Sequence, residues 1–188
     1  MQLWIGLGNP GPAYALHRHN VGFMAIDAIA EVHGAAPPQK KHRGWLQDIR
    51  LGSARILLLK PATYMNESGR SARAALDFFK LAPEAVTVFY DELDLAPFKV
   101  KVKRGGGAAG HNGIRSLDSH IGNDFRRVRL GIGHPGHKDR VTGHVLGNFA
   151  KTELDPLTDM LGALAAEAEW LARGDDARFM NEVALRMQ

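Results

Sequence analysis

LWIGLGNPG, residues 3–11, and AVTVFYDEL, residues 85–93, decide the fold class. Each contains a short apolar run that ends in a turn or in acidic residues, which is typical of a buried strand. Apolar residues at helical spacing follow the first run: Val21, Met24, Ala28 and Val32. A buried strand that leads into a helix opens an α/β fold. We therefore expect an α/β protein.

The segments next to these two runs extend the pattern. Residues 45–51 and 54–60 are apolar runs joined across Gly52-Ser53, and this arrangement predicts a β-hairpin. The prolines and charges of residues 35–44 predict a loop before it. The strand pattern therefore continues beyond the first helix.

Further helices are indicated by apolar residues three or four positions apart. One is expected after Pro61, with Ala72, Leu76 and Phe79 facing inward. A short one is expected around Ile114, Leu117 and Ile121, behind the glycine-rich residues 105–110. After residue 150 the pattern is helical only, with a break at Gly174: Leu154, Leu157, Leu161, Leu164, Ala168, Leu171, Phe179, Val183 and Met187.

Two further strands carry positive charge on one face. In FKVKVKR, residues 98–104, apolar residues alternate with lysines, and in RRVRLGIG, residues 126–133, they alternate with Arg127 and Arg129. Residues 99–140 hold ten Lys or Arg against three acids, whereas residues 151–188 hold four against eight. This distribution indicates a surface that meets a polyanion, or else ordinary solvated charge.

Composition narrows the classes of protein. With 188 residues and 45% hydrophobic residues, the chain is long enough for one well-filled core, and we expect a single domain over residues 1–188. No window approaches the ~18 apolar residues of a membrane span, and no signal peptide is indicated, so we expect a soluble, unprocessed protein. The absence of cysteine excludes disulfides, thiolate metal sites and a cysteine nucleophile. It also favours a cytoplasmic location.

A histidine and a carboxylate form the first candidate pair. His19 lies in RHN, where the loop turns into the first helix, and the positive end of that helix favours the neutral imidazole that a general base must be. Asp91 lies at the end of a strongly apolar strand, where open α/β sheets place functional groups. Because Phe89 and Asp91 share a face of that strand, Asp91 is preferred to Glu92 as the partner of His19. Such a carboxylate would fix the tautomer of the base.

Three asparagines near loop ends form a second candidate group. Asn9 lies in the first loop, whereas Asn66 and Asn112 precede expected helices. Helix N-caps are the ordinary role of such asparagines. If they converge on one cleft, they would instead supply neutral hydrogen-bonding groups for an ester and a peptide backbone.

Other motifs point to different chemistry. Gly6, Gly8 and Gly11 match the G-x-G-x-x-G dinucleotide fingerprint, but Pro10 and Pro12 remove two of the backbone donors that a pyrophosphate needs. The nine histidines show no H-E-x-x-H spacing, so no metal site is expected. No G-x-S-x-G is present, which argues against a serine nucleophile. The glycine run at 105–110 is compatible with an anion site or a tight turn.

Taken together, the segments resemble the bacterial peptidyl-tRNA hydrolase family. Its motifs follow one another in the family's order as GLGNPGPAY (6–14), RHNVGFMAID (18–27), KPATYMNESG (60–69), DELDLAP (91–97), KRGGGAAGHNGIRS (103–116), RLGIGHPG (129–136) and VLGNF (145–149). The helical C-terminus matches only in type. The resemblance implies a mixed sheet surrounded by helices. It also implies hydrolysis of the ester between peptide and tRNA by a cytoplasmic monomer that needs no metal, other cofactor or obligate protein partner.

The resemblance also assigns roles position by position. It implies that His19 activates water and that Asp91 orients His19. Asn9, Met65, Asn66 and Asn112 would line the cleft, with Asn9 and Asn112 among the catalytic groups. Tyr14 and His111 would surround them, and Lys103 and Arg129 would clamp the 5′ phosphate of tRNA. His17 stands where many members carry threonine, a departure that concerns the local shape and pH response around His19.

Two other classes remain open at this stage. A non-catalytic RNA-binding module could use the same basic strands, although only Phe98 and Phe125 lie near them for base stacking. A nucleotide-binding oxidoreductase rests on the glycine fingerprint alone. Titration with NAD or NADP separates the oxidoreductase from the other two classes, and release of peptide from peptidyl-tRNA separates the hydrolase from the module.

Overall fold

A seven-stranded mixed sheet forms the centre of the computed structural model, which describes all 188 residues. Its order is β2-β3-β4-β1-β5-β7-β6. The four central strands β4, β1, β5 and β7 are parallel, and the outer strands pair antiparallel. The bounds are β1 Gln2–Gly6, β2 Gln39–Lys41, β3 Gly44–Leu51, β4 Ala54–Pro61, β5 Val86–Glu92, β6 Val100–Arg104 and β7 Arg126–Gly131. The α/β class and the mixed sheet are therefore confirmed.

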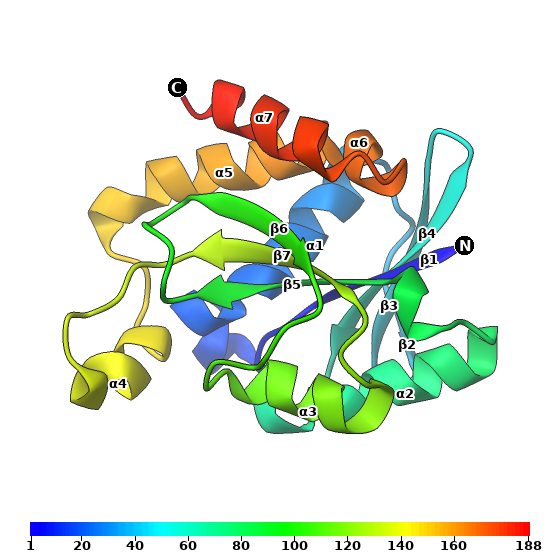
Figure 1. Ribbon diagram of the computed structural model, residues 1–188, viewed down its shortest axis with the longest axis horizontal. Coiled ribbons are helices and arrows are strands. Elements are labelled where there is room, and N and C mark those ends of the chain that lie inside the picture. Colours follow the sequence, from blue (N-terminus) through cyan, green and yellow to red (C-terminus); the bar gives the residue numbers. More distant parts are fainter.

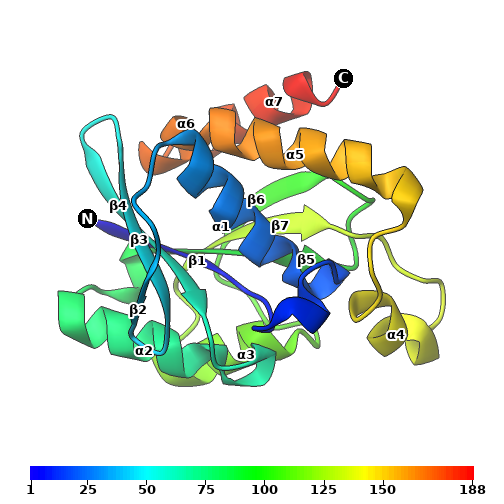
Figure 2. The ribbon, with the colours of Figure 1, turned by 180° about the vertical axis from the view of Figure 1, so that it is seen from behind.

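Helices cover both faces of the sheet (Figures 1 and 2). On one face lie α1 (Val21–Val32), α5 (Leu154–Ala166), α6 (Ala168–Ala172) and α7 (Asp176–Arg186). On the other lie α2 (Ser68–Phe79) and α3 (Asn112–Ile121), whereas the short α4 (Val141–Val145) stands apart at the end of the sheet. Each face has its own core, with Trp4 and Phe89 in the first and Leu3 and Tyr90 in the second. No helix has the length and hydropathy needed to cross a bilayer.

Glycines bring α1 unusually close to the sheet. A methyl group on Gly6 would overlap the carbonyl oxygen of Gly22, and one on Gly22 would overlap the carbonyl oxygen of Phe89. A methyl group on Gly8 would lie 2.7 Å from the ring of Phe23. Only a three-residue 3-10 turn, Pro12–Tyr14, follows Gly11, and the first α-helix begins at Val21, so the glycine loop does not open the α-helix that the dinucleotide motif requires. Two glycines of the fingerprint thus serve close packing, which sets the start of α1 against the ends of β1 and β5.

Several details differ from the sequence prediction. Part of the predicted loop at 35–44 is strand β2, which pairs with β3 and so becomes an edge. Val32 and Leu154 share the helical spacing of the apolar residues, as expected, but they are 57% and 41% exposed. Both lie at helix ends beyond the sheet, where spacing alone does not report burial. The C-terminal helix also divides once more, at Glu167 between α5 and α6.

The basic face of the predicted strands is only partly a surface. Arg127 is fully buried and Arg126 is 6% exposed, because α3, the glycine-rich loop and α7 cover their strand. Arg126 donates to Asp176 at 2.9 Å, and burial lowers its pKa although Asp176 opposes that effect. The prediction of a continuous cationic face on β7 was therefore wrong. Alternation shows which residues share one side of a strand, but it does not show whether that side is exposed. Arg127 can be buried because it is paired and hydrogen-bonded.

Candidate active site

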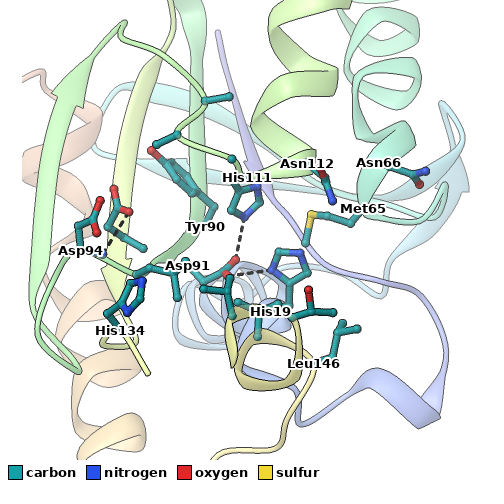
Figure 3. A pocket seen from close by; sticks show the side chains of 18 of the residues that line it. His19, Met65, Asn66, Tyr90, Asp91, Asp94, His111, Asn112, His134 and Leu146 are labelled. Carbon is teal, nitrogen blue, oxygen red and sulfur yellow. Dashed lines mark hydrogen bonds and ion pairs between the residues drawn. The ribbon is translucent and has the colours of Figure 1, made fainter. Parts of the chain in front are cut away.

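A pocket of about 690 Å³ lies at the carboxyl ends of β1 and β5. The chain passes from β1 to β4 on one side and then to β5 on the other, so this is the point where the connections diverge and where open α/β sheets bind ligands. Of the ten candidate residues, eight line the pocket: Asn9, His19, Met65, Asn66, Asp91, Lys103, His111 and Asn112. Tyr14 and Arg129 do not. Figure 3 shows His19, Asp91 and His111 meeting near the centre.

Asp91 holds two histidines at once. Its Oδ2 lies 2.8 Å from Nδ1 of His19 and its Oδ1 lies 2.9 Å from Nε2 of His111. All three side chains are at most 10% exposed. The predicted pairing of His19 with Asp91 is present, across 72 positions of sequence.

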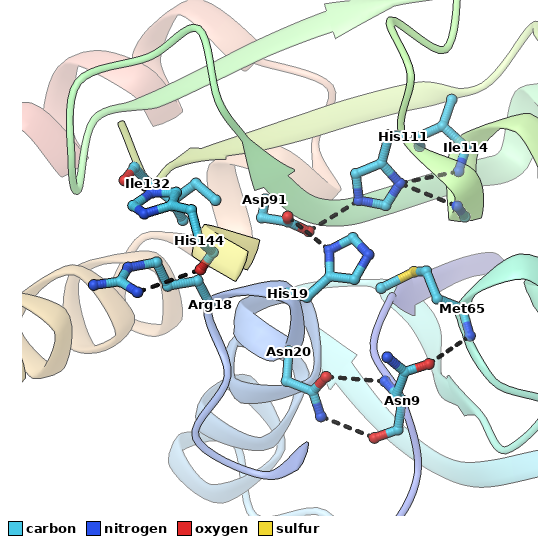
Figure 4. A network of polar contacts seen from close by, with 11 residues as sticks. Asn9, Arg18, His19, Asn20, Met65, Asp91, His111, Ile114, Ile132 and His144 are labelled. Carbon is cyan, nitrogen blue, oxygen red and sulfur yellow. Dashed lines mark hydrogen bonds and ion pairs between the residues drawn. The ribbon is translucent and has the colours of Figure 1, made fainter. Parts of the chain in front are cut away.

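The protonation pattern follows from the hydrogen bonds. Burial alone would raise the pKa of Asp91, but the charges and hydrogen bonds of His111 and His19 reverse this and hold the pKa far below its ordinary value. An ionised carboxylate only accepts hydrogen bonds, so both histidines donate to it. Nε2 of His19 is then the nitrogen left with a lone pair, and it points away from Asp91 (Figure 4). His19 thus has the tautomer of a general base.

His111 is fixed from its other side as well. Its Nδ1 accepts hydrogen bonds from the backbone N–H groups of Gly113 and Ile114, at 3.1 and 3.3 Å, so it is the N-cap of α3. Because Nδ1 is an acceptor, the ring carries its hydrogen on Nε2 and donates it to Asp91. The fold therefore decides the tautomer of His111 as well.

The three asparagines have different environments. The side-chain oxygen of Asn9 accepts the N–H of Met65 at 2.7 Å, and its backbone exchanges two hydrogen bonds with the amide of Asn20. Neither Asn66 nor Asn112 is an N-cap, because Glu67 and His111 hold those positions. Both are exposed and line the pocket at the start of α2 and α3. N-capping is therefore not their role. The side-chain oxygen of Asn112 accepts from Arg115 at 3.4 Å, and the amide N–H groups of both side chains make no hydrogen bond within the chain.

Helices α2 and α3 both begin at the pocket and pack against each other through Gly69, whose N–H donates to Ser116 at 2.9 Å. The positive ends of both helix dipoles therefore face the same space. Both dipoles stabilise negative charge that develops there. This is the electrostatic environment that acyl transfer requires.

Of the two predicted clamp residues, only Lys103 faces the pocket. It is exposed and makes no ion pair. Arg129 is 22% exposed and lies 3.8 Å from Glu92. The two residues lie on adjacent strands, β6 and β7, but the charge of Lys103 is free whereas that of Arg129 lies near a carboxylate.

The aromatic Tyr14 lies beside the pocket instead of within it. Its ring packs edge-on against His17 and Tyr64, with centroids 5.4 and 6.2 Å away. His17 forms an isolated bridge with Asn148. The departure from threonine at this position therefore falls where the first loop meets the segment after α4.

A metal ion could in principle be held by the same three residues, since ligand atoms of His19, Asp91 and His111 lie within 4.8 Å of one another. Two of these contacts are already hydrogen bonds, and Nδ1 of His111 is taken by the backbone. A metal would have to replace those hydrogen bonds. The donor set fits a hydrogen-bonded relay without one.

Several pocket residues escaped sequence reasoning. The rim opposite α3 comes from α4 and the segment before it: His134, Lys138, Val141, Thr142, Val145 and Leu146. Asn20, which holds the backbone of Asn9, was also missed. Its position directly after His19 in RHN was the available signal, but nothing in the spacing indicated α4, which has no buried residue.

Fold and site together define a class: an α/β protein with a buried carboxylate, a histidine in the tautomer of a general base and two helix N-termini, as in a hydrolase that activates water. The peptidyl-tRNA hydrolase family model matches residues 3–188. Proteins named peptidyl-tRNA hydrolase from Sphingopyxis alaskensis and Erythrobacter litoralis are 77% and 73% identical to this chain over 188 residues, the full length of each pair. A crystal structure of peptidyl-tRNA hydrolase from Acinetobacter baumannii superimposes with a TM-score of 0.90 at 39% identity, covering 97% of this chain and 94% of that one. The chain belongs to the peptidyl-tRNA hydrolase family.

Proposed function

We propose that this enzyme hydrolyses the ester that joins a peptide to the 3′ end of tRNA, releasing free tRNA and peptide for recycling. The observation that carries the proposal is the 2.8 Å contact between Nδ1 of His19 and Asp91 at the floor of the pocket. A base oriented in this way can deprotonate water at neutral pH. Family membership supplies the substrate class.

In the proposed reaction His19 Nε2 removes a proton from water as the water oxygen attacks the ester carbonyl carbon. Asp91 stabilises the imidazolium that results. The carbonyl oxygen becomes negatively charged, and the amides of Asn66 and Asn112 with the N-termini of α2 and α3 stabilise it. When the intermediate collapses, the ribose oxygen leaves and takes the proton from His19. The products are a tRNA hydroxyl and a peptide carboxylic acid, which ionises to the carboxylate and releases its proton to solvent.

The remaining candidate residues take substrate-binding roles. Asn9 fixes the backbone of Met65 and so shapes the pocket wall beside His19. His111 orients Asp91. Lys103 contacts RNA phosphate at the pocket edge, with Arg129 behind it on β7 and Tyr14 supporting the first loop. We also propose that residues 1–188 form one domain that binds tRNA as a cytoplasmic monomer without an obligate protein partner or cofactor.

The test uses purified, chelator-treated protein and a defined peptidyl-tRNA in water enriched in ¹⁸O. We expect release of both products, with one ¹⁸O in the peptide carboxylate and none in the tRNA. No release by the chelated protein, restored by adding a divalent metal, would show that the relay is a metal site. Label in the tRNA would show that water attacks the ribose carbon and not the carbonyl carbon, which would contradict the proposed reaction.

A further inference from the structure

A second basic groove lies on the same side of the sheet as α2 and α3, outside the pocket already described. It has a volume of about 390 Å³ and is lined by Arg43, Arg70, Arg73, Ala74, Asp77 and His120. Three arginines face one carboxylate in this groove. Arginine's planar fork matches phosphate oxygens better than any other side chain does.

The turn that carries Arg43 is strained. His42 and Arg43 are the two central residues between β2 and β3, with Lys41 opposite Gly44, and their φ angles are 54° and 57°. A two-residue turn with both φ positive normally carries Asn-Gly, because other side chains crowd the backbone there. This chain keeps the costly conformation at both positions. Such strain persists only where the surroundings hold it.

Ring packing and two hydrogen bonds hold the turn. The ring of His42 packs on Phe78 and Phe79, with centroids 4.8 and 5.3 Å away. Its carbonyl oxygen accepts the hydroxyl of Ser71 at 2.6 Å, and the carbonyl oxygen of Arg43 accepts the N–H of Ala62 at 2.9 Å. These contacts give the side chain of His42 a structural role, but they involve only the backbone of Arg43. The exposed guanidinium of Arg43 makes no hydrogen bond or ion pair within the chain.

The other two arginines are oriented by neighbouring acids. Arg70 lies 2.8 Å from Glu67, and Asp77 accepts from Nε and Nη2 of Arg73 at 3.0 and 2.7 Å. Such surface pairs add little stability. They do fix which way the guanidinium groups face.

The groove lies close to the catalytic pocket. Asn66, in the 3-10 turn just before α2, lines the pocket, and Arg70 and Arg73 follow on α2. At ~1.5 Å of rise per residue, Arg73 lies about 10 Å farther along. An RNA strand whose 3′ end occupies the pocket reaches that distance within a few nucleotides.

We infer that Arg43, Arg70 and Arg73 form a second binding site for RNA backbone phosphate, separate from Lys103. The inference rests on the proposed function, because the polyanion is the tRNA portion of that substrate. An acidic peptide could bind the same charges, but RNA is favoured because the substrate already brings it there. The site positions substrate and takes no part in bond cleavage.

The decisive variant is Arg43→Gly. Glycine adopts a positive φ without crowding, so this change is expected to raise Tm while it weakens binding of deacylated tRNA about threefold to tenfold. A structural role for Arg43 predicts that stability and binding fall together. Unchanged tRNA affinity in Arg43→Gly would overturn the inference.

Arg73→Ala and the double variant Arg43→Gly/Arg73→Ala extend the test, with Arg173→Ala as matched control. Arg173, which follows α6 directly, is paired at i,i+4 with Glu169, as Arg73 is with Asp77, but it lies in the acidic C-terminal region. We expect the slope of log Kd for tRNA against log salt to fall by about 2 in the double variant and to stay unchanged in the control. If the double variant and the Arg173→Ala control show the same slope, the inference is wrong. It is also wrong if the double variant binds tRNA normally but loses affinity for poly-glutamate, because the groove would then bind acidic peptides.

Hydrolysis of a minimal substrate separates this inference from the proposed function. For a peptide ester of adenosine, which has no RNA backbone, the double variant is expected to retain wild-type kcat/KM. If wild type fails to cleave both this ester and peptidyl-tRNA, the proposed function fails, whatever the tRNA affinities show. If the variant loses activity on the adenosine ester alone, the groove acts on the active site and the inference is wrong.

Discussion

The catalytic cluster and the RNA-facing cations are built in opposite ways. The side chains of Asp91, His19 and His111 are at most 10% exposed and are joined by two hydrogen bonds, whereas Lys103 and Arg43 are exposed and make no ion pair. Bond cleavage requires one protonation state and one orientation, which only a dry, hydrogen-bonded site can hold. Docking of a polyanion requires only positive charge near the surface, because phosphate contacts carry no sequence information.

Arg127 shows that sequence pattern alone does not separate the two kinds of residue. It shares a face of β7 with Arg129, yet it is fully buried and donates to the carbonyl oxygens of Gly107 and Gly106 at 2.7 and 2.8 Å. It also contacts Asp118 at 3.3 Å and lies over the ring of Phe125. A residue in the cationic strand thus holds the glycine-rich loop that delivers His111, and it belongs with the cluster.

The largest expected effect comes from removing the base. His19→Ala is expected to lower kcat by ~10²- to 10⁴-fold, because water then lacks the group that takes its proton. The Kd for deacylated tRNA should stay within a factor of two of wild type. The exposed His137→Ala is the control for loss of a histidine. Retained turnover would show that His19 is not the general base.

A smaller effect is expected for Asp91→Asn. The amide can accept from only one of the two histidines, so one of them adopts the wrong tautomer, and we expect kcat to fall by roughly 10²-fold. Rates at single turnover measure this directly. A variant with wild-type kcat would show that the carboxylate's charge is not needed.

The same variant tests pH-dependent stability. The pKa of Asp91 is lowered in the folded state, so the carboxylate stabilises the fold above its unfolded pKa, about 4, and this contribution is lost as pH falls through the folded value. Wild type should therefore exceed Asp91→Asn in free energy of unfolding at pH 7, and the difference should shrink below about pH 4. Urea titrations at both ends of the range check the sign. A difference that grows on acidification would contradict it.

Arg127→Met should perturb the cluster at a distance. Two carbonyl groups and Asp118 lose their donor, which costs about 2–4 kcal/mol of stability. We expect faster hydrogen exchange at residues 105–110 and about tenfold lower kcat, with tRNA affinity little changed. Arg127→Lys restores part of the hydrogen bonding and should recover part of kcat. If tRNA affinity falls instead, Arg127 belongs with the RNA-facing cations.

Lys103→Ala is expected to give the smallest effect. KM for peptidyl-tRNA should rise a few-fold at ~0.1 M salt, and the slope of log KM against log salt should drop by about 1, with kcat unchanged. Lys101→Ala, on the same strand, is the matched control. A fall in kcat would mean that Lys103 acts on the reacting groups.

The sequence predicted those site residues that are marked by a local motif at a helix start or a strand end. RHN before a helix and YDELD at a strand end marked His19 and Asp91, because helix N-termini and strand ends are local features. The role of His111 as N-cap and second partner of Asp91 was not visible. It depends on the glycine-rich loop folding back over β5, which Arg127 enforces from the next strand.

The sequence by itself determined the α/β class, the main strands and helices, and the chemical types available at the pocket, since periodicity and turn residues act over a few positions. Only the tertiary structure decided which charges are buried, which asparagines are free of capping and which arginines share a groove. Burial and pairing depend on segments far apart in the chain, and the free energy of a charged or polar group is set by those neighbours.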